Sequence, residues 1–390
     1  MNKRIMWLDG LKGLACIGVL AHHFLVAFLP ATYYGDVNMS KLQNQGDVLL
    51  SQAPYAFFIN GNYMVALFCL VSALVLGLKI MNLEKKQDVA DMFIKRYPRL
   101  MLPIVPIIFS VYLMLKYECF AHLQTVSLTQ SPWLGAFYLE KVSFKRCIDG
   151  IFVTTWYTSD STFSNAFWML GSLFFGSMLA MILSMFTWKI KRNAVDIIYV
   201  FCILIYIRVN TLQLAFVLGV LLAHLYKERK GLFHHRWIGM ICLLLGIFLG
   251  GYPSGVMPTN IYRYLNFLPP EISAFQLWHI FGAFFTVYGL WNLVYVCKVL
   301  ECRFMQFLGK ISYAIYLIHI PLLFSGSCYV FNRMMELGRF SYLKSVGITF
   351  IFTMLCVLVL AYFYNRYVEG WCNKWLNMLL KKISVEEKDI

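Results

Sequence analysis

The residues best suited to chemistry lie in one apolar stretch near the start of the chain. The stretch LKGLACIGVLAHHF (11–24) contains Lys12, His22 and His23 among apolar side chains. Imidazole is the side chain that most readily takes a proton from a hydroxyl near neutral pH. An ionisable side chain inside a membrane-spanning stretch is costly and marks a functional candidate.

Helix geometry separates the two histidines. At about 100° per residue, Lys12 and His23 lie within about 20° of each other around a helix and about 16 Å apart along its axis. His22 is rotated about 80° away from Lys12. We therefore predict that His23 is the functional ring. The alternative for His23 is a buried neutral imidazole that bridges helices, and for Lys12 it is an interfacial lysine reaching the headgroups.

A second cluster lies in FIKRYPRL (93–100), which contains Arg96 and Arg99. Two arginines three positions apart share a helical face and can grip phosphate groups bidentately. Pro98 suits the first turn of a helix, so we expect both arginines at a helix N-terminus, where backbone N–H groups also favour anions. The alternative is plain anchoring of the chain at the cytoplasmic membrane surface.

The composition shows which elements must position these residues. Hydrophobic residues make up 60% of the 390 positions and charged residues only 14%, whereas a soluble domain is about a quarter charged. Apolar runs of the length that a spanning helix needs recur along the chain. We expect an all-α polytopic membrane protein of about ten transmembrane helices, with a membrane domain over 1–370 and a short charged tail over 371–390. The ten stretches are 11–30, 61–80, 100–118, 166–187, 194–209, 211–226, 237–252, 273–297, 308–330 and 342–365.

The placement of the positive charge predicts topology. The net charge is +15, and an even number of spans puts both termini on one side. The loops on that side hold most of the lysines and arginines, as in 81–99 with Lys85, Lys86, Lys95 and Arg96. Because positive charge is retained inside, both termini are predicted to be cytoplasmic, and the basic balance does not indicate nucleic acid. The sequence contains no metal signature. It also contains no Gly-rich phosphate loop, and this absence argues against an ATP-driven pump.

The opposite side carries two long loops, 31–60 and 119–165. The second is rich in aromatic side chains, including Trp133, Tyr138 and Trp156. External loops of this size can shape a site at the membrane surface. The aromatic part, 131–157, suits either contact with sugar rings or interfacial anchoring.

Four segments together resemble the membrane acyltransferase-3 family, which O-acylates cell-surface carbohydrates. The first is WLDGLKGLACIGVLAHHF (7–24), in which Lys12 and His23 match a basic residue, ten residues, then His. The second is NGNYMVALFCLVSALVLGL (60–78), similar to the family's second span. The third is Arg96-x-x-Arg99, and the fourth is LGKISYAIYLIHIPLL (308–323).

The resemblance implies an activity and roles. It implies transfer of an acetyl or other acyl group from cytoplasmic acyl-CoA, most simply acetyl-CoA, to a hydroxyl of a surface or exported polysaccharide. His23 would be the general base or a transient acyl carrier, while Lys12, Arg96 and Arg99 would bind the donor's phosphates. The pantetheine arm would run along the first helix. The implied location is the lipid bilayer of a bacterial inner membrane. The protein would transfer the acyl group to the acceptor directly, or a separate extracytoplasmic transferase would complete the transfer as its partner.

One position departs from the family pattern. Its middle helix often has Trp, Glu five residues later, then Gly-Ser; here Trp168 is in register but the acidic position is Leu173. External Asp149, Asp160 and Glu271 are the possible substitutes, and the sequence does not choose among them. In the late segment, Ser312, Tyr313 and His319 match the pattern, and we favour helix packing as the role of His319. His279 carries no motif and is expected to be structural.

Two other functions fit parts of the sequence. A transporter or flippase of lipid-linked saccharides would suit ten spans, but it would be expected to show charges in several spans or internal repeats. A receptor or scaffold without chemistry would explain the missing glutamate. Binding of acetyl-CoA separates the enzyme from both.

Overall fold

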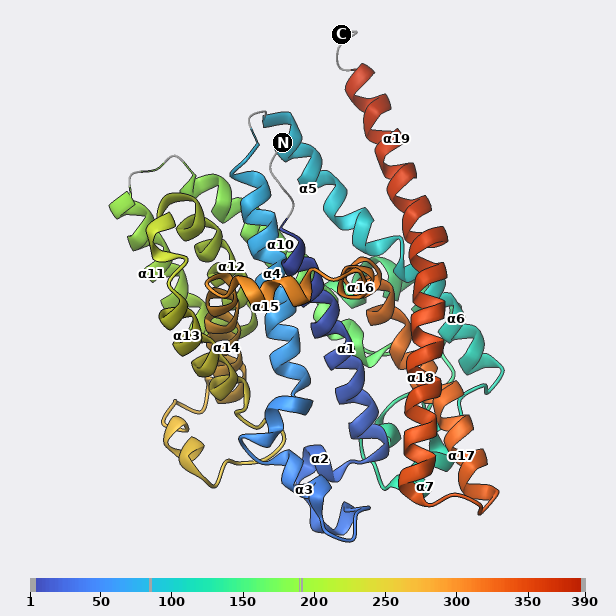
Figure 1. Cartoon of the computed structure of the whole chain (residues 1–390). Helices are drawn as coiled ribbons and strands as arrows, with labels where there is room; N and C mark the ends of the chain where they lie inside the picture. Colours follow the sequence, from blue (N-terminus) through green and yellow to red (C-terminus); the bar gives the residue numbers. More distant parts are fainter. Residues whose placement is uncertain (1–4, 84–85, 189, 191, 387–390) are drawn as a thin grey trace. The chain divides into compact units, whose positions relative to one another are not determined.

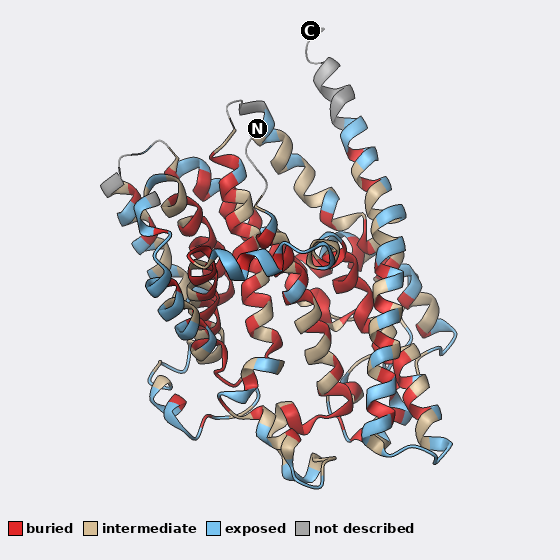
Figure 2. Ribbon diagram, viewed as in Figure 1, coloured by how far each residue is buried: buried red, intermediate tan, exposed pale blue. Residues whose placement is uncertain are grey.

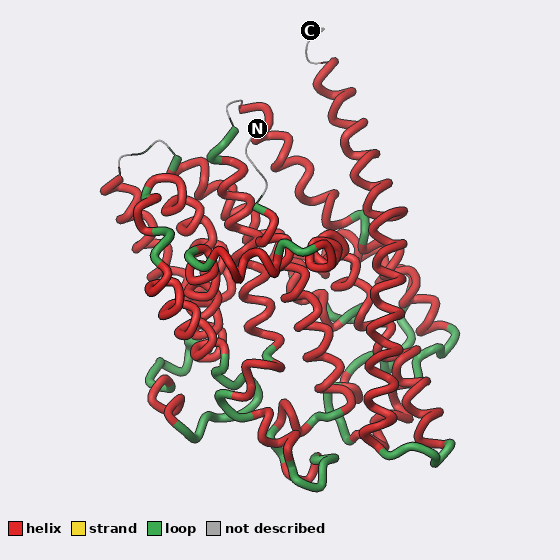
Figure 3. Tube along the Cα trace, viewed as in Figure 1, coloured by secondary structure: helices red, strands yellow, loops and turns green. Residues whose placement is uncertain are grey.

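The computed structural model describes residues 5–83, 86–188, 190 and 192–386. All regular structure in these residues is helical, and none of them forms a strand (Figure 3). The expected all-α fold is therefore confirmed. Lys85, one of the cations used to predict the topology, lies outside the described residues.

The chain divides into two compact units, labelled here by their residues. Unit 1 comprises 1–82, 129–131 and 175–310, and unit 2 comprises 83–128, 132–174 and 311–390. Each unit is assembled from segments far apart in the sequence. Two helices, α10 (Trp168–Thr187) and α16 (Arg303–Leu322), contribute residues to both units (Figure 1).

Unit 1 is a bundle of long apolar helices with short helices in its loops. Its long helices are α1 (Met6–Phe28), α4 (Gly61–Ile80), α11 (Arg192–Val209), α12 (Thr211–Glu228), α13 (Arg236–Gly250) and α14 (Ala274–Trp291). Its short elements are α2 (Ala31–Tyr34), η1 (Val37–Met39), α3 (Gly46–Ser51), η2 (Tyr55–Ile59), η6 (Lys230–Leu232), η7 (Ile261–Leu265) and α15 (Val294–Leu300).

Glycines let the helices of unit 1 approach closely. A Cβ atom on Gly219 of α12 would lie 2.4 Å from the carbonyl oxygen of Leu70 on α4. On α13, a Cβ on Gly246 would lie 2.2 Å from the hydroxyl of Thr286 on α14. Small residues at helix interfaces allow this backbone-to-backbone packing in membranes, where water supplies no hydrophobic drive between helices.

Several helices of unit 2 are interrupted. Its helices are α5 (Lys86–Met101), α6 (Ile104–Lys116), α7 (His122–Thr129), α8 (Phe144–Asp149), α9 (Thr155–Tyr157), α17 (Cys328–Glu336), α18 (Tyr342–Tyr364) and α19 (Gly370–Glu386), with the 3-10 turns η3 (Leu134–Ala136) and η5 (Asn165–Phe167). Three π-helical segments interrupt them: η4 (Gly150–Thr154), η8 (Leu323–Ser327) and η9 (Asn365–Glu369). The helix from α18 runs on through η9 and α19, so the predicted tail 371–390 is helical as far as Glu386.

The structure supports part of the predicted set of membrane spans and leaves the count of ten unconfirmed. Each of the ten apolar stretches is mainly helical, but six helices in the described residues are long and apolar enough to cross a membrane. A seventh is possible if α14 and α15, bent by 104°, form one span. Helix α13 has 15 residues, which is short of the roughly 20 that a span needs. The six are Met6–Phe28, Gly61–Ile80, Asp88–Lys116, Asn165–Thr187, Arg303–Glu336 and Tyr342–Leu379.

Candidate functional site

Helix α1 carries both residues of the first motif. It is continuous from Met6 to Phe28, so Lys12 and His23 lie on nearly the same face about 16 Å apart. The Lys12 ammonium pairs with the Asp9 carboxylate at 3.1 Å, and both side chains are mostly buried. Asp9 was not among the predicted site residues, although its position one turn before Lys12 is the signal that would have found it.

The two histidines of α1 have different surroundings. His22 Nδ1 lies 2.7 Å from the carbonyl oxygen of Ile59, and because a carbonyl only accepts, Nδ1 carries the proton. The His22 ring also packs against Gly61, where a Cβ would lie 2.5 Å from it, and against Tyr33 with ring centroids 5.5 Å apart. His22 thus joins α1 to the start of α4. His23 is half-buried, with its ring centroid 5.4 Å from that of His22.

A polar network holds the same end of α4. Asn60 donates to the carbonyl oxygens of Gly250 and Tyr252 at 3.2 and 2.8 Å. His279 Nε2 lies 2.8 Å from both the Asn60 amide nitrogen and the Tyr252 carbonyl oxygen. His279 therefore connects α14 to the start of α4 and to the segment after α13. Contacts of this kind are those of a structural side chain.

The arginine pair does not lie at a helix N-terminus. Helix α5 begins at Lys86 and continues through Pro98 to Met101, so Arg99 is in its last turn. The expectation was wrong because proline removes only the bond to the carbonyl four residues earlier, and the preceding turns of this helix survive that loss. Arg96 is half-buried and Arg99 is exposed. Cations at a helix C-terminus are favoured by the helix dipole, so the end of α5 favours the two arginines themselves and not a bound anion.

Two tyrosines from distant helices bind the break between α5 and α6. The hydroxyl of Tyr313 on α16 donates to the carbonyl oxygen of Leu100 at 2.7 Å. The hydroxyl of Tyr364, at the end of α18, donates to the carbonyl oxygen of Pro103. Both acceptors lie where the helix is interrupted and backbone carbonyls lose partners. Tyr313 also interacts electrostatically with Arg96, so this predicted residue belongs with the arginines.

Glu369 is a site residue that the sequence reasoning missed. It lies in the π-helical segment η9 and interacts electrostatically with Arg99. Its Oε2 accepts from the Asn365 amide at 3.0 Å, while its buried Oε1 has no hydrogen-bond partner among the described residues. π-Helical turns are frequent at functional sites. The signal in the sequence was that Glu369 is an isolated acidic residue at the end of a long apolar stretch.

The other motif residues of unit 2 are packed against its helices. Trp168 is the first residue of α10 and Ser312 is buried in α16. His319 Nδ1 lies 2.8 and 3.1 Å from the carbonyl oxygens of Tyr316 and Ile315 in its own helix. Leu173, at the position of the family's glutamate, is also buried.

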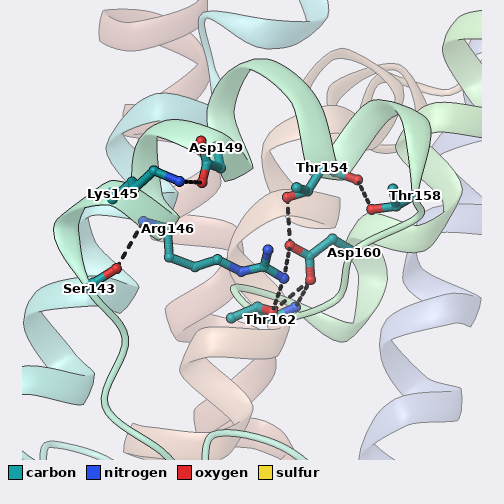
Figure 4. Close-up of polar contacts among 8 residues, drawn as sticks. All are labelled: Ser143, Lys145, Arg146, Asp149, Thr154, Thr158, Asp160 and Thr162. Atoms are coloured by element: carbon teal, nitrogen blue, oxygen red, sulfur yellow. Dashed lines mark hydrogen bonds and ion pairs between the residues drawn. The ribbon is translucent and has the colours of Figure 1, made fainter.

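The three candidate substitutes for that glutamate differ in their partners. Asp160 pairs with Arg146 at 2.8 Å and is 9% exposed (Figure 4). Asp149 pairs with Lys145 at 3.4 Å and is far more accessible. Glu271 is exposed in a separate loop of unit 1. Within the described residues, no three His, Cys, Asp or Glu side chains come together as a metal site.

The structure thus brings predicted site residues together within each unit. Lys12 and His23 share a helix in unit 1, and Arg96, Arg99 and Tyr313 meet in unit 2.

Comparison with known proteins gives this arrangement a context. A family model described as "Acyltransferase domain" (Acyl_transf_3) matches residues 5–365. The chain is 29% identical over 155 residues to "Acyltransferase clz18" of Cochliobolus lunatus and 27% identical over 153 residues to "Acyltransferase R4" of Phoma sp. (strain ATCC 20986 / MF5453). Each alignment covers 38% of this chain and 33% of the relative, so the chain matches about a third of their length. No solved structure matches.

Proposed function

The chain belongs to the Acyl_transf_3 family of acyltransferase domains, and from that membership we propose that it is a multi-pass membrane O-acyltransferase. The donor is a cytoplasmic acyl-CoA, most simply acetyl-CoA. The acceptor is a hydroxyl of a surface or exported polysaccharide. The observation that carries the proposal is the family match across 5–365, which includes Lys12, His23, Arg96 and Arg99.

The arginine pair is the donor-binding element of this proposal. Coenzyme A carries several phosphate charges, and arginine binds phosphate by two parallel charge-assisted hydrogen bonds. Arg99 is exposed at the end of α5, and Arg96 is one turn earlier on the same face. Tyr313 and Tyr364 fix the backbone just after them.

His23 is the catalytic residue of this proposal. As a general base, its unprotonated ring nitrogen takes the proton of the acceptor hydroxyl as the oxygen attacks the thioester carbonyl. The C–S bond breaks, the ester forms, and the imidazolium returns the proton to the departing thiolate. As an acyl carrier, the same nitrogen attacks the thioester carbonyl and the thiolate leaves. The acceptor oxygen then attacks the acyl group, the N–acyl bond breaks, and the hydroxyl proton goes to the thiolate. His22 is unsuited to either role, because its ring is held between α1 and the start of α4.

The cellular setting completes the proposal. The protein lies in a bacterial inner membrane with both termini cytoplasmic and about ten spans, and the acceptor is outside. Transfer is either direct or completed by a separate extracytoplasmic transferase. The six candidate spans support the multi-pass part of this statement.

The test is the O-acetyl content of the host's surface polysaccharide, measured by proton NMR. A deletion strain is complemented with the wild type, His23→Ala or His22→Ala, at equal expression. We expect acetyl signals to return with the wild type and with His22→Ala, but not with His23→Ala.

Two results would contradict the proposal. If His23→Ala restored the acetyl signals, the His23 ring would not be the catalytic group. Unchanged acetylation after deletion, together with failed polysaccharide export, would replace the enzyme with the transporter or flippase of lipid-linked saccharides.

A further inference from the structure

Two cations lie over one aromatic ring at the end of unit 1 where α13 begins and α14 ends. Helix α15 turns away from α14 by 104° and runs across its axis (Figure 1). The ring of Tyr295 on α15 has the Arg236 guanidinium 5.9 Å and the Lys298 ammonium 5.6 Å from its centroid. All three side chains are exposed. Two like charges are therefore held close together on one part of the surface.

Hydrogen bonds hold the start of α13 at the end of α14. The backbone N–H of His235, just before α13, donates to the side-chain oxygen of Asn292 at 2.9 Å. The hydroxyl of Tyr288 on α14 donates to the carbonyl oxygen of Leu232 at 2.6 Å. The first residue of α13, Arg236, is therefore placed beside α15 by the backbone, and its long side chain only completes the contact.

The positive charge of this cluster is not balanced locally. Within the described residues, neither Arg236 nor Lys298 forms an ion pair with a carboxylate. Glu301 follows Lys298 by three positions and is exposed, but it does not pair with it. The nearby Arg229 differs, because it binds Asp196 at 2.6 Å. A tyrosine ring attracts a cation only weakly at an exposed site, so both cations of the cluster remain available to an anion.

An apolar surface continues from the cations along α13. Trp237, Ile241 and Leu244 are exposed, and their spacing of four and three residues places them on one face of the helix. Leu244 lies about 12 Å along the helix axis from Arg236. Tryptophan and tyrosine are enriched where a membrane meets water. The surface therefore has positive charge at one end and apolar side chains leading away from it.

Charge and polarity together select an amphipathic anion. Arginine binds phosphate by two parallel charge-assisted hydrogen bonds, and lysine adds a compact positive charge. Both cations lie against the Tyr295 ring, so a zwitterionic headgroup would bring a third positive charge to the same place. Basic clusters between membrane helices suit anionic lipid headgroups. A phospholipid with a net negative headgroup satisfies both ends of this surface.

We propose that the cluster of Arg236, Tyr295 and Lys298 binds the phosphate of an anionic phospholipid, whose acyl chains lie along the exposed face of α13. Helix α13 has 15 residues and begins at this cluster, so the bound headgroup lies where this short helix meets the membrane surface. The site does not depend on the proposed acyl transfer, because none of its three residues belongs to the donor or catalytic groups.

Binding is measured on the full-length protein in detergent micelles by native mass spectrometry. Phosphatidylglycerol and phosphatidylcholine with the same acyl chains are titrated separately, and the dissociation constant of the first bound lipid is determined. We expect phosphatidylglycerol to bind the wild type at least about fivefold more tightly than phosphatidylcholine. Arg236→Gln and Lys298→Gln should each weaken phosphatidylglycerol binding at least about threefold and leave phosphatidylcholine binding unchanged.

Two further variants separate a site from the general attraction of anionic lipid to a basic protein. Tyr295→Leu keeps every charge but removes the ring over which the cations lie, so it should weaken phosphatidylglycerol binding about twofold or more. The matched control is Arg263→Gln in the loop before α14. Arg263 also lies over a tyrosine ring, that of Tyr264, at 4.8 Å, and its loss should leave the affinity unchanged.

Several results would overturn the proposal. The two lipids might bind the wild type equally, Tyr295→Leu might bind like the wild type, or Arg263→Gln might lose as much affinity as Arg236→Gln. Glycerol phosphate, which has the phosphate but no acyl chains, distinguishes a lipid from a soluble ligand. It should not displace phosphatidylglycerol at an equal concentration, and displacement would replace the lipid with a soluble phosphate compound.

Discussion

The two units of this protein are stabilised in different ways. Unit 1 is held by close helix contacts through glycines, as at Gly219 and Gly246, where even one added carbon would collide with a neighbouring helix. Unit 2 contains all three described π-helical segments, and its helices are joined by phenol-to-carbonyl hydrogen bonds and buried charges.

The way each unit is held together suits the candidate site residues that it contains. The candidate catalytic ring, His23, lies in the closely packed unit, where a group must be held at a fixed position to be effective. The arginines lie in the unit with interrupted helices, whose freed backbone groups and half-buried charges can accommodate polar ligands. The close glycine contacts of α12 and α13 in unit 1 and the interrupted helices of unit 2 therefore predict different sensitivities to mutation.

The largest expected effect tests the packing of unit 1. Gly219→Leu should destabilise the protein by about 3 kcal/mol or more, because the new side chain collides with the backbone of α4 at Leu70. The measurement is the thermal unfolding temperature in nanodiscs. The control is Gly347→Leu in α18, where an added Cβ meets nothing within 4 Å. Equal unfolding temperatures for the two variants would contradict the comparison.

The next effect tests the donor site of unit 2. Arg99→Ala should weaken coenzyme A binding by about 10- to 100-fold, since a charged hydrogen bond contributes about 1.5–3 kcal/mol. Calorimetric titration with coenzyme A at constant salt measures it. Lys95→Ala on the same helix, which removes a cation already paired with Asp91 at 3.8 Å, should change the affinity little. An equal loss in both variants would indicate general attraction rather than a site.

A smaller effect concerns the ion pair between Arg146 and Asp160 in unit 2. Burial raises the pKa of Asp160, but hydrogen bonds from Thr154 and Thr162 and the charge of Arg146 together hold it below its ordinary value of 3.8. A lowered folded pKa gives stability that is present above 3.8 and lost as the pH falls through the lower folded value. Asp160→Asn should cost about 1 kcal/mol at pH 7, after allowance for the partly exposed Arg146.

The pH dependence provides the check on Asp160. The difference in unfolding temperature between the wild type and Asp160→Asn should shrink as the pH is lowered below about 3.8. Asp149→Asn, which alters an exposed pair on the same segment, should stay within about 0.5 kcal/mol of the wild type. A difference for Asp160→Asn that grows in acid would contradict the assignment.

The smallest effect concerns Glu369. Glu369→Gln keeps an acceptor for the Asn365 amide but removes a carboxyl group that interacts electrostatically with Arg99. Coenzyme A should therefore bind about two- to fivefold more tightly, in keeping with about 1 kcal/mol or less for a partly exposed charge pair. The same titration measures it. Weaker binding would show that Glu369 orients Arg99 instead of competing with the phosphates.

The helices and the first motif were predictable because they depend on local pattern. Apolar runs predicted the all-helical fold, and the eleven-residue spacing placed Lys12 and His23 on one face of a continuous helix. The surroundings of Arg99 were not predictable, because they depend on Pro98 lying inside a helix and on Glu369, which is 270 positions later in the sequence. The position of Tyr138 likewise depends on a backbone conformation that tyrosine rarely adopts, with φ +58°, and no sequence pattern predicts it.

The last candidate span, Tyr342–Leu379, has a consequence for the protein's response to its lipid. Its 38 residues would extend about 57 Å at 1.5 Å per residue, whereas a hydrocarbon core is about 30 Å thick. Tilts of up to about 40° cannot absorb that mismatch, so part of this helix leaves the bilayer. Much of its surface is exposed in the protein (Figure 2). Trp371 and Trp375 stack on each other near its end, and tryptophan is a residue type enriched at membrane interfaces. Because Glu369 lies just before them, the thickness of the bilayer would set the depth of this carboxylate, and acyl chain length in the lipid would tune the donor site.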